Sequence, residues 1–339
     1  MADKINWGVL GNATIARKCV IPAIQKSNTG RVTALATRSP SAAKETARQF
    51  DIPRIYEGYR ALLADDTIDA VYLPLPNHLH LPWTREALAA GKHVLCEKPL
   101  ALNAAEAGEM AAAAKAADRL LMEALMYRFH PRSQEIKQRV TAGDIGVPRL
   151  VRAGFCFHID KKIFESADNI RLKPETGGGA LLDTGCYCVS VARWYLDAEP
   201  TAVQAQAIYH PGGVDCHLVG TIRFGDSALA TIETSFMTAL QQTYTVVGSE
   251  AAIELPHDAF IPWEKDASYV VRKQKEESGT SHTVAGADEY RLMVEHFASA
   301  AMSRAKPACP PEDSIANMRV LDALARSAKT GKRIDLQPK

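Results

Sequence analysis

The stretch that decides the fold of the first half of the chain is Gly8-Val9-Leu10-Gly11-Asn12-Ala13-Thr14-Ile15-Ala16. It follows the apolar run 5–10, and the residues after it have the apolar spacing of a helix. Gly11, Ala13 and Ala16 stand where the dinucleotide fingerprint has small residues, which let a pyrophosphate approach the amino end of a helix. Because two of the three glycines are missing, the same letters also fit a ligand-free strand-to-helix turn. We predict dinucleotide contacts from Gly11, Asn12, Ala13, Thr14 and Ile15.

Around this turn, short β-branched runs alternate with helical patterns, which is typical of βαβ units with a parallel sheet. The predicted strands are residues 5–10, 31–36, 70–73, 93–96 and 120–123, and the predicted helices are residues 14–27, 41–50, 80–90 and 104–117. The fold class is therefore α/β, with a doubly wound parallel Rossmann sheet over residues 1–124.

From Arg149 onward the pattern changes to longer segments with period-two alternation, which indicates a second, α+β domain over residues 125–339. Strands are predicted at 150–159, 202–209, 217–224, 228–236 and 242–247, with helices at 179–196 and 315–329. We expect a large, mostly antiparallel open sheet and a final helix that packs back towards the first domain. The alternating apolar residues suggest that the outer face of this sheet is buried in a homodimer; they are Val219, Ile222, Leu229, Ile232 and Phe236.

The charge balance excludes partners that are recruited mainly by electrostatics. Forty Lys and Arg against thirty-nine Asp and Glu leave a formal net charge of +1, so we expect no nucleic-acid partner and no membrane partner. No apolar run approaches the roughly 18 residues of a membrane span, and the start of the chain lacks a secretory signal. Seven cysteines, an odd number, predict reduced thiols. These features predict a cytoplasmic protein that acts on a small molecule.

The second predicted strand ends in Thr37, Arg38 and Ser39. A NAD-specific site usually has an acidic residue here, which accepts a hydrogen bond from the ribose 2′-hydroxyl. A guanidinium and two hydroxyls suit a 2′-phosphate instead, so the sequence predicts NADP(H) in preference to NAD. The alternative is that Arg38 is only a solvated surface residue.

The strand at 70–73 leads into Pro74-Leu75-Pro76-Asn77-His78-Leu79-His80 at the edge of the sheet where such folds bind ligands. Cofactor contacts are predicted from Leu75, Pro76, Asn77 and His80. His78 and His80 have no carboxylate or thiolate cluster beside them, and we predict no metal site.

Two further motifs bring side chains suited to proton transfer. In Cys96-Glu97-Lys98-Pro99, Lys98 follows a strand, where a partly desolvated ammonium can donate to a substrate hydroxyl or lower the pKa of a neighbouring acid. In Gly177-Gly178-Gly179-Ala180-Leu181-Leu182-Asp183-Thr184-Gly185-Cys186-Tyr187, Asp183 and Tyr187 are four apart and share a helix face. Taken alone, Lys98 also fits a solvated lysine, and Tyr187 a core tyrosine with a satisfied hydroxyl.

Together, in this order and spacing, the three motifs resemble the Gfo/Idh/MocA oxidoreductase superfamily over nearly the whole chain. Its members have a Rossmann domain with Glu-Lys-Pro after a late strand, and then an α+β domain carrying Gly-Gly-Gly-x-Leu-x-Asp-x-Gly-x-His. Tyr187 stands here in place of that histidine, which is similar to the branch of dihydrodiol dehydrogenases, NADP-dependent D-xylose dehydrogenases and sugar ketoreductases. Residues 122–131, 169–171 and 317–320 point the same way.

The resemblance implies that Tyr187 is the acid/base and Lys98 its electrostatic partner, with Asp183 beside the substrate or orienting Lys98. A phenol of ordinary pKa about 10 becomes useful near neutrality when a fixed ammonium favours its anion, and oxidation should therefore prefer alkaline pH. It also implies cofactor contacts from Glu97, Lys98 and Arg128, and substrate contacts from Arg128, His158, Arg171, Asp183 and Tyr187.

The predicted activity is NADP(H)-dependent hydride transfer to or from a sugar, a polyol, a dihydrodiol or a related alcohol or carbonyl compound. One alternative is a glycosidase or epimerase that keeps NAD(P) bound and uses transient oxidation. Another is a non-catalytic NADP-binding sensor, against which the intact set of Lys98, Asp183 and Tyr187 argues.

Overall fold

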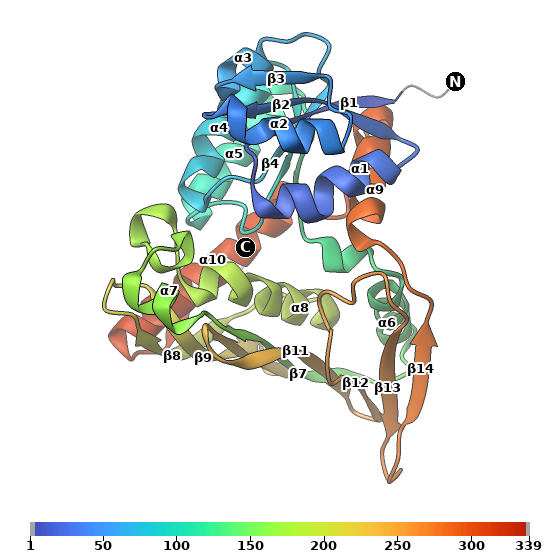
Figure 1. Ribbon diagram of the computed structural model, residues 1–339. Coiled ribbons are helices and arrows are strands. Elements are labelled where there is room, and N and C mark those ends of the chain that lie inside the picture. The colour runs from blue at the N-terminus through green and yellow to red at the C-terminus, as the bar shows by residue number, and fades with distance from the viewer. Residues whose placement is uncertain (1–3, 337–339) are drawn as a thin grey trace. The chain divides into compact units, whose positions relative to one another are not determined.

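The computed structural model describes residues 4–336 and divides the chain into two compact units (Figure 1). The first unit contains the chain up to Phe129 together with Asp288–Ile315, and the second contains His130–Ala287 and the chain from Ala316 onward. The first crossover lies five residues beyond the predicted boundary at 124. Helix α9 (Glu289–Ser303) is the late segment that returns to the first unit, whereas most of the final helix, α10 (Pro311–Thr330), belongs to the second.

The first unit is built on a six-stranded sheet in the order β3-β2-β1-β4-β5-β6, with every neighbouring pair parallel. Its strands are β1 (Ile5–Leu10), β2 (Gly30–Thr37), β3 (Arg54–Glu57), β4 (Ala70–Leu73), β5 (His93–Cys96) and β6 (Leu121–Glu123). All four residues of β4 are buried, as expected for a strand in a parallel sheet covered on both faces. This is the predicted doubly wound Rossmann sheet.

Helices cover both faces of this sheet. They are α1 (Ile21–Lys26), α2 (Pro40–Gln49), α3 (Tyr59–Leu63), α4 (His80–Ala89), α5 (Ala104–Ala117) and α9. Helix α1 packs against α9, and α4 packs against α5 (Figure 1). Strand β3 and helix α3 are absent from the sequence prediction, because each is only four or five residues long and has no clear apolar period.

The second unit is built on a nine-stranded sheet in the order β14-β13-β12-β11-β7-β10-β9-β8-β15. Its strands are β7 (Pro148–His158), β8 (Ala202–Tyr209), β9 (Asp215–Phe224), β10 (Ala228–Ser235), β11 (Met237–Gly248), β12 (Ala251–Leu255), β13 (Ala267–Lys273), β14 (Thr280–Val284) and β15 (Ile334–Asp335). All neighbouring pairs are antiparallel except β7 and β10. The sequence predicted the large, mostly antiparallel sheet but only five of its nine strands.

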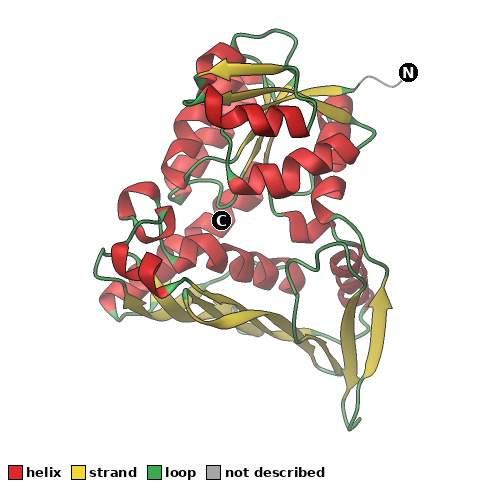
Figure 2. Ribbon diagram, viewed as in Figure 1, coloured by secondary structure: helices red, strands yellow, loops and turns green. Residues whose placement is uncertain are grey.

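One face of this sheet is covered by helices. The helices of this unit are α6 (Pro131–Ala142), α7 (Lys161–Ser166), α8 (Cys186–Leu196) and most of α10, and α8 packs on β7 and β10. Within residues 4–336, no helix covers the other face (Figure 2). Val219 and Leu229 lie on that bare face and are 50% and 52% exposed.

The other three residues predicted for the bare face, Ile222, Ile232 and Phe236, are buried in the core instead. That part of the prediction is wrong, because Val219 and Ile222 are an odd number of positions apart in one strand and must face opposite sides. Leu229 and Ile232 differ in the same way.

The remaining general features concern thiols and hydropathy. All seven cysteines are buried and none forms a disulfide, as predicted. Among residues 4–336, no helix combines the length and the apolar character that crossing a bilayer requires.

Candidate active site

The turn after β1 is rigid and has the backbone approach that a dinucleotide needs. Gly11 has φ +113°, and a Cβ at this position would lie 3.0 Å from Cδ2 of Leu75, so a glycine is required. The side-chain amide of Asn12 donates to the carbonyl of Ala42 at 3.0 Å, and its oxygen accepts from Thr46 at 3.0 Å. Asn12 thus ties the turn to α2. The following helix opens with a π turn at Ala16–Val20, a form that is frequent at functional sites.

The surroundings of this turn fit a dinucleotide. The turn follows β1, which lies between β2 and β4, and at such a topological switch point the carboxyl ends of the strands form the ligand crevice. Arg38 is exposed at the end of β2, while Thr37 is buried and its hydroxyl accepts from the amide of Ser39 at 3.2 Å. Tyr59, which the sequence analysis missed, places its hydroxyl 3.8 Å from the Cβ position of Gly11.

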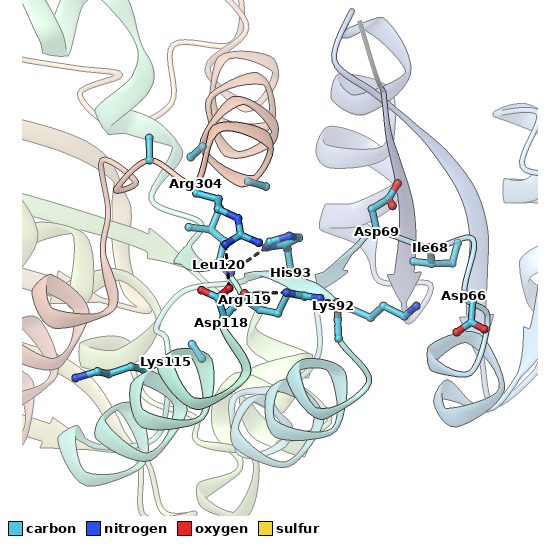
Figure 3. A pocket seen from close by; sticks show the side chains of 15 residues that line it. Asp66, Ile68, Asp69, Lys92, His93, Lys115, Asp118, Arg119, Leu120 and Arg304 are labelled. Carbon is cyan, nitrogen blue, oxygen red and sulfur yellow. Dashed lines mark hydrogen bonds and ion pairs between the residues drawn. The ribbon is translucent and has the colours of Figure 1, made fainter.

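A separate pocket of about 610 Å³ lies at the opposite edge of this sheet (Figure 3). Its lining includes Asp69, Lys92 and Leu120, which immediately precede β4, β5 and β6. His93 accepts a hydrogen bond from the amide of Leu120 at 2.9 Å, and Arg304 lies 3.3 Å from Asp118. The pocket is therefore at the amino ends of the strands and is not the predicted cofactor site.

Lys98 belongs to a loop that is held by several hydrogen bonds after β5. The hydroxyl of Tyr72 donates to Glu97 at 2.5 Å, and the other carboxylate oxygen of Glu97 accepts from the amide of Lys98 at 3.3 Å. The Lys98–Pro99 peptide is cis. Lys98 itself is half-buried at the carboxyl edge of the sheet, where the sequence analysis expected it.

Glu123, at the end of β6, holds this loop through a hydrogen bond to its backbone. It is 1% exposed, and its Oε1 accepts from the amide of Leu100 at 2.9 Å. Burial raises the pKa of Glu123 to about 6, with the nearby Ser314 hydroxyl acting in the opposite direction and the charge of Asp313 adding to the increase. The fold therefore disfavours the ionised carboxylate.

We expect Glu123→Gln to change the free energy of unfolding more favourably at alkaline pH than at acid pH. Because the folded pKa is raised from 4.5, the stabilising effect of this group is complete below about pH 4.5 and is lost as the pH rises through about 6. The loss amounts to about 2 kcal/mol, which the glutamine avoids.

Urea denaturation of both proteins at pH 4 and pH 8 measures this difference. Glu109→Gln, which changes a carboxylate that is 57% exposed on α5, is the matched control and should show no such pH dependence. If the free energy of unfolding changed with pH equally in the two variants, the raised pKa of Glu123 would be contradicted.

Two of the residues predicted to contact a ligand are buried and have partners within the first unit. Arg128 is only 5% exposed, and its NH1 lies 2.7 Å from Asp313 of the same unit, so its guanidinium serves an internal ion pair. His80 is fully buried, with both ring nitrogens against backbone carbonyls of Leu75, Pro99 and Leu100. Contact of either side chain with a ligand stays a prediction.

In the second unit, the glycine motif allows two close contacts at the start of the helix that carries Tyr187. A Cβ on Gly178 would lie 2.5 Å from the carbonyl oxygen of Arg171, and one on Gly179, which has φ +115°, would collide with the carboxylate of Asp215. That carboxylate accepts from the amide of Leu181 at 2.7 Å. Asp215 therefore satisfies the free amides of the helix start, which no local sequence signal could reveal.

Asp183 and Tyr187 both lie on this helix, which is wound as a π turn over Leu181–Gly185 before α8 begins. Nε of Arg171 donates to Asp183 at 2.7 Å, and the negative charge of Asp183 raises the pKa of Arg171 against the effect of burial. An ionised Tyr187 phenol acts in the same direction as Asp183. Tyr187 is 4% exposed, and its ring packs against Phe155 and Phe260 at centroid distances of 5.4 and 5.6 Å.

The predicted catalytic residues thus fall into two groups. Asp183, Tyr187 and Arg171 are brought together in the second unit, whereas Lys98 belongs to the first. Asp183 has Arg171 as an ion-pair partner, which the sequence analysis did not foresee. His158 is exposed at the end of β7. Convergence of Lys98 with Tyr187 stays a prediction.

Comparisons with known proteins agree with the fold and the motifs. Residues 5–125 match the oxidoreductase family with an NAD-binding Rossmann fold, and residues 133–254 match the GFO/IDH/MocA C-terminal domain. The chain belongs to the Gfo/Idh/MocA family of oxidoreductases.

Three similar proteins indicate the range of chemistry within this family. The chain is 37% identical to D-xylose 1-dehydrogenase (NADP(+)) 2 of Haloferax volcanii, over 97% of this chain and 99% of that one. It is 32% identical to trans-1,2-dihydrobenzene-1,2-diol dehydrogenase of Xenopus tropicalis, over 84% and 83%. A crystal structure of KijD10, a 3-ketoreductase from Actinomadura kijaniata in complex with NADP and TDP-benzene, superposes with a TM-score of 0.89 at 30% identity, covering 96% and 98%.

Proposed function

We propose that this protein is an NADP(H)-dependent oxidoreductase of sugars, polyols or related alcohol and carbonyl compounds. The observation that carries the proposal is the cluster of three side chains in the second unit. Asp183 and Tyr187 lie on a helix whose start is held by glycines and Asp215, and Arg171 reaches Asp183 from the turn Ile170–Leu172. The similarity to a D-xylose dehydrogenase and a 3-ketoreductase supports this substrate class.

The chain's own residues supply proton transfer and charge. A bound nicotinamide would accept or supply the hydride of the reaction. In oxidation, the Tyr187 phenolate takes the proton of the substrate hydroxyl, and in reduction the Tyr187 phenol returns a proton to the oxygen. Lys98 favours the phenolate by its positive charge. Arg171 orients Asp183 by a hydrogen bond to one carboxylate oxygen, and Asp183 can accept hydrogen bonds from substrate hydroxyls.

Arg38 is proposed to select NADP(H) by binding the 2′-phosphate of the adenosine. The support is its exposed position at the end of β2, next to the switch point, and the NADP named for two similar proteins.

We expect Arg38→Ala to raise KM for NADP⁺ by on the order of tenfold while changing KM for NAD⁺ by less than about twofold, because only one cofactor carries the phosphate. Steady-state kinetics with each cofactor measures this ratio. Arg48→Ala provides the control, since Arg48 is exposed on α2 of the same unit and pairs with Glu45. Equal losses with both cofactors would contradict the role.

The activity itself is tested with purified protein and a substrate panel. NADP⁺ and NAD⁺ are offered with D-xylose, other aldoses, polyols and trans-dihydrodiols, and NADPH is offered with ketosugars and dicarbonyls. Accumulation of NADPH with at least one alcohol, or its consumption with a carbonyl compound, is expected. Product formation with a cofactor that never exchanges would favour the glycosidase or epimerase alternative. NADP binding without any turnover would favour the sensor.

We propose a homodimer formed through the bare face of the nine-stranded sheet. Val219 and Leu229 are half-exposed there, on neighbouring strands, and a second copy would bury them. Sedimentation should show a dimer for the native chain and a monomer for Val219→Lys combined with Leu229→Lys. A native monomer at assay concentration would overturn this proposal. The seven buried cysteines, none of which forms a disulfide, fit a reducing compartment, and we propose the cytoplasm as the location.

A further inference from the structure

His80 connects two loops at the carboxyl edge of the Rossmann sheet. It begins α4 and is completely buried. Its Nε2 lies 2.8 Å from the carbonyl oxygen of Leu75, and its Nδ1 lies 3.0 Å from that of Pro99 and 3.3 Å from that of Leu100. The ring therefore spans the loop after β4 and the loop after β5.

Each of these loops carries a part of the proposed site. The side chain of Leu75 lies against the Gly11 turn, where a Cβ would come within 3.0 Å of it. Pro99 directly follows Lys98, and the amide of Leu100 is fixed by Glu123 at 2.9 Å. A continuous set of contacts thus runs from the dinucleotide turn through Leu75 and His80 to the backbone beside Lys98.

We infer that His80 is a positioning residue that sets Lys98 relative to the dinucleotide turn. The inference rests on the proposed function, in which Lys98 favours the Tyr187 phenolate. His80 touches neither cofactor nor substrate in this account, because it has no exposed surface. It acts through the backbone of Pro99 and Leu100, whose orientation decides where the preceding side chain projects.

Hydrogen bonding, rather than shape alone, explains a histidine at this position. Burial lowers the pKa of His80, with Lys98 acting in the same direction and the three carbonyls opposing it. A neutral imidazole carries one N–H, so it donates to a carbonyl of one loop and packs against the carbonyl of the other. A buried carbonyl that loses its donor costs about 1–3 kcal/mol, so an apolar side chain would remove the hydrogen bond that joins the ring to one of the loops.

The test compares three substitutions of His80. His80→Leu removes both polar contacts, His80→Asn keeps an amide near the place of Nδ1, and His80→Gln keeps one near the place of Nε2. We expect His80→Leu to lower kcat by on the order of tenfold or more, because small misplacement of a catalytic group is costly. In the pH profile of kcat for alcohol oxidation, the rise in activity towards alkaline pH (the alkaline limb) should move to higher pH. The reason is that a displaced Lys98 stabilises the Tyr187 phenolate less. At least one amide variant should recover part of both losses.

His93→Leu is the matched control, since His93 lies in the same sheet and also bonds to backbone, but at the amino edge beside the pocket of Figure 3. It should reduce stability and leave the pH profile unchanged. An unaltered profile in His80→Leu would overturn the inference, and so would Asn and Gln variants that are as impaired as Leu. If His80→Leu does not fold, the two amide variants decide in the same way.

Hydrogen exchange separates this inference from the proposed function. In protein without any substrate, His80→Leu should accelerate exchange of the Leu100 amide by tenfold or more relative to His93→Leu, because the loop is released. A native chain with no turnover would end the proposed function and leave this readout intact. Unchanged exchange at Leu100 would end the positioning role even in an active enzyme.

Discussion

Tyr187→Phe is expected to lower kcat for alcohol oxidation by on the order of 10³-fold, within the range that general acid/base groups contribute. The phenylalanine keeps the ring that packs against Phe155 and Phe260, so the fold should be retained. It removes the only atom of this side chain that can exchange a proton. NADP⁺ binding should change by less than about threefold, because the proposed cofactor contacts lie in the first unit.

The pH profile adds a readout that lost packing would not affect. The native enzyme should gain activity towards alkaline pH as the phenolate forms, and the variant should lose this limb. Tyr195→Phe is the matched control on the same helix. Its hydroxyl bonds to Tyr244 at 2.8 Å, so the change should cost about 1 kcal/mol of stability and leave the limb in place. A native profile governed by a group near pH 6.5, insensitive to Tyr187→Phe, would contradict the assignment of the phenol.

The fold was largely predictable because its strongest signals are local. Strands β1, β4 and β5 are short apolar runs bounded by turns, and their predicted limits agree with the structure residue for residue. The segments β12, β13 and β14 were missed, since their alternating residues are interrupted by polar loops. Helix α9 was missed as well, and its return to the first unit depends on packing between segments more than 150 positions apart.

The candidate site was predictable to the extent that motifs name residue types. Lys98, Asp183 and Tyr187 are in motifs, and the structure places them at a sheet edge and at a helix start. What supports them could not be predicted, because the partners are remote in the chain. Asp215 reaches the amide of Leu181 across 34 positions, and Glu123 reaches that of Leu100 across 23. The ion pair of Arg128 could not be predicted for the same reason, since its partner Asp313 is 185 positions away.

Lys98→Met is expected to lower kcat by on the order of 10²–10³-fold and to displace the alkaline limb towards higher pH, because the phenol then ionises without the positive charge that we propose Lys98 to supply. Methionine preserves most of the aliphatic stem and removes the charge. Lys92→Met is the matched control at the other end of β5. Lys92 is 4% exposed and its ammonium donates to the carbonyl of Asp65, so its loss should reduce stability and leave the limb unchanged.

The double variant Lys98→Met with Tyr187→Phe tests whether the two side chains act on one proton. If Lys98 works only by favouring the phenolate, removing it from a protein that has no phenol should cost little more, and the double variant should be about as slow as Tyr187→Phe alone. Independent contributions would multiply instead, giving a loss of roughly 10⁵–10⁶-fold. The double-mutant cycle, measured as kcat at saturating NADP⁺ and substrate, therefore reports whether Lys98 acts through Tyr187. Multiplicative losses would show that Lys98 serves the substrate or the cofactor independently of Tyr187.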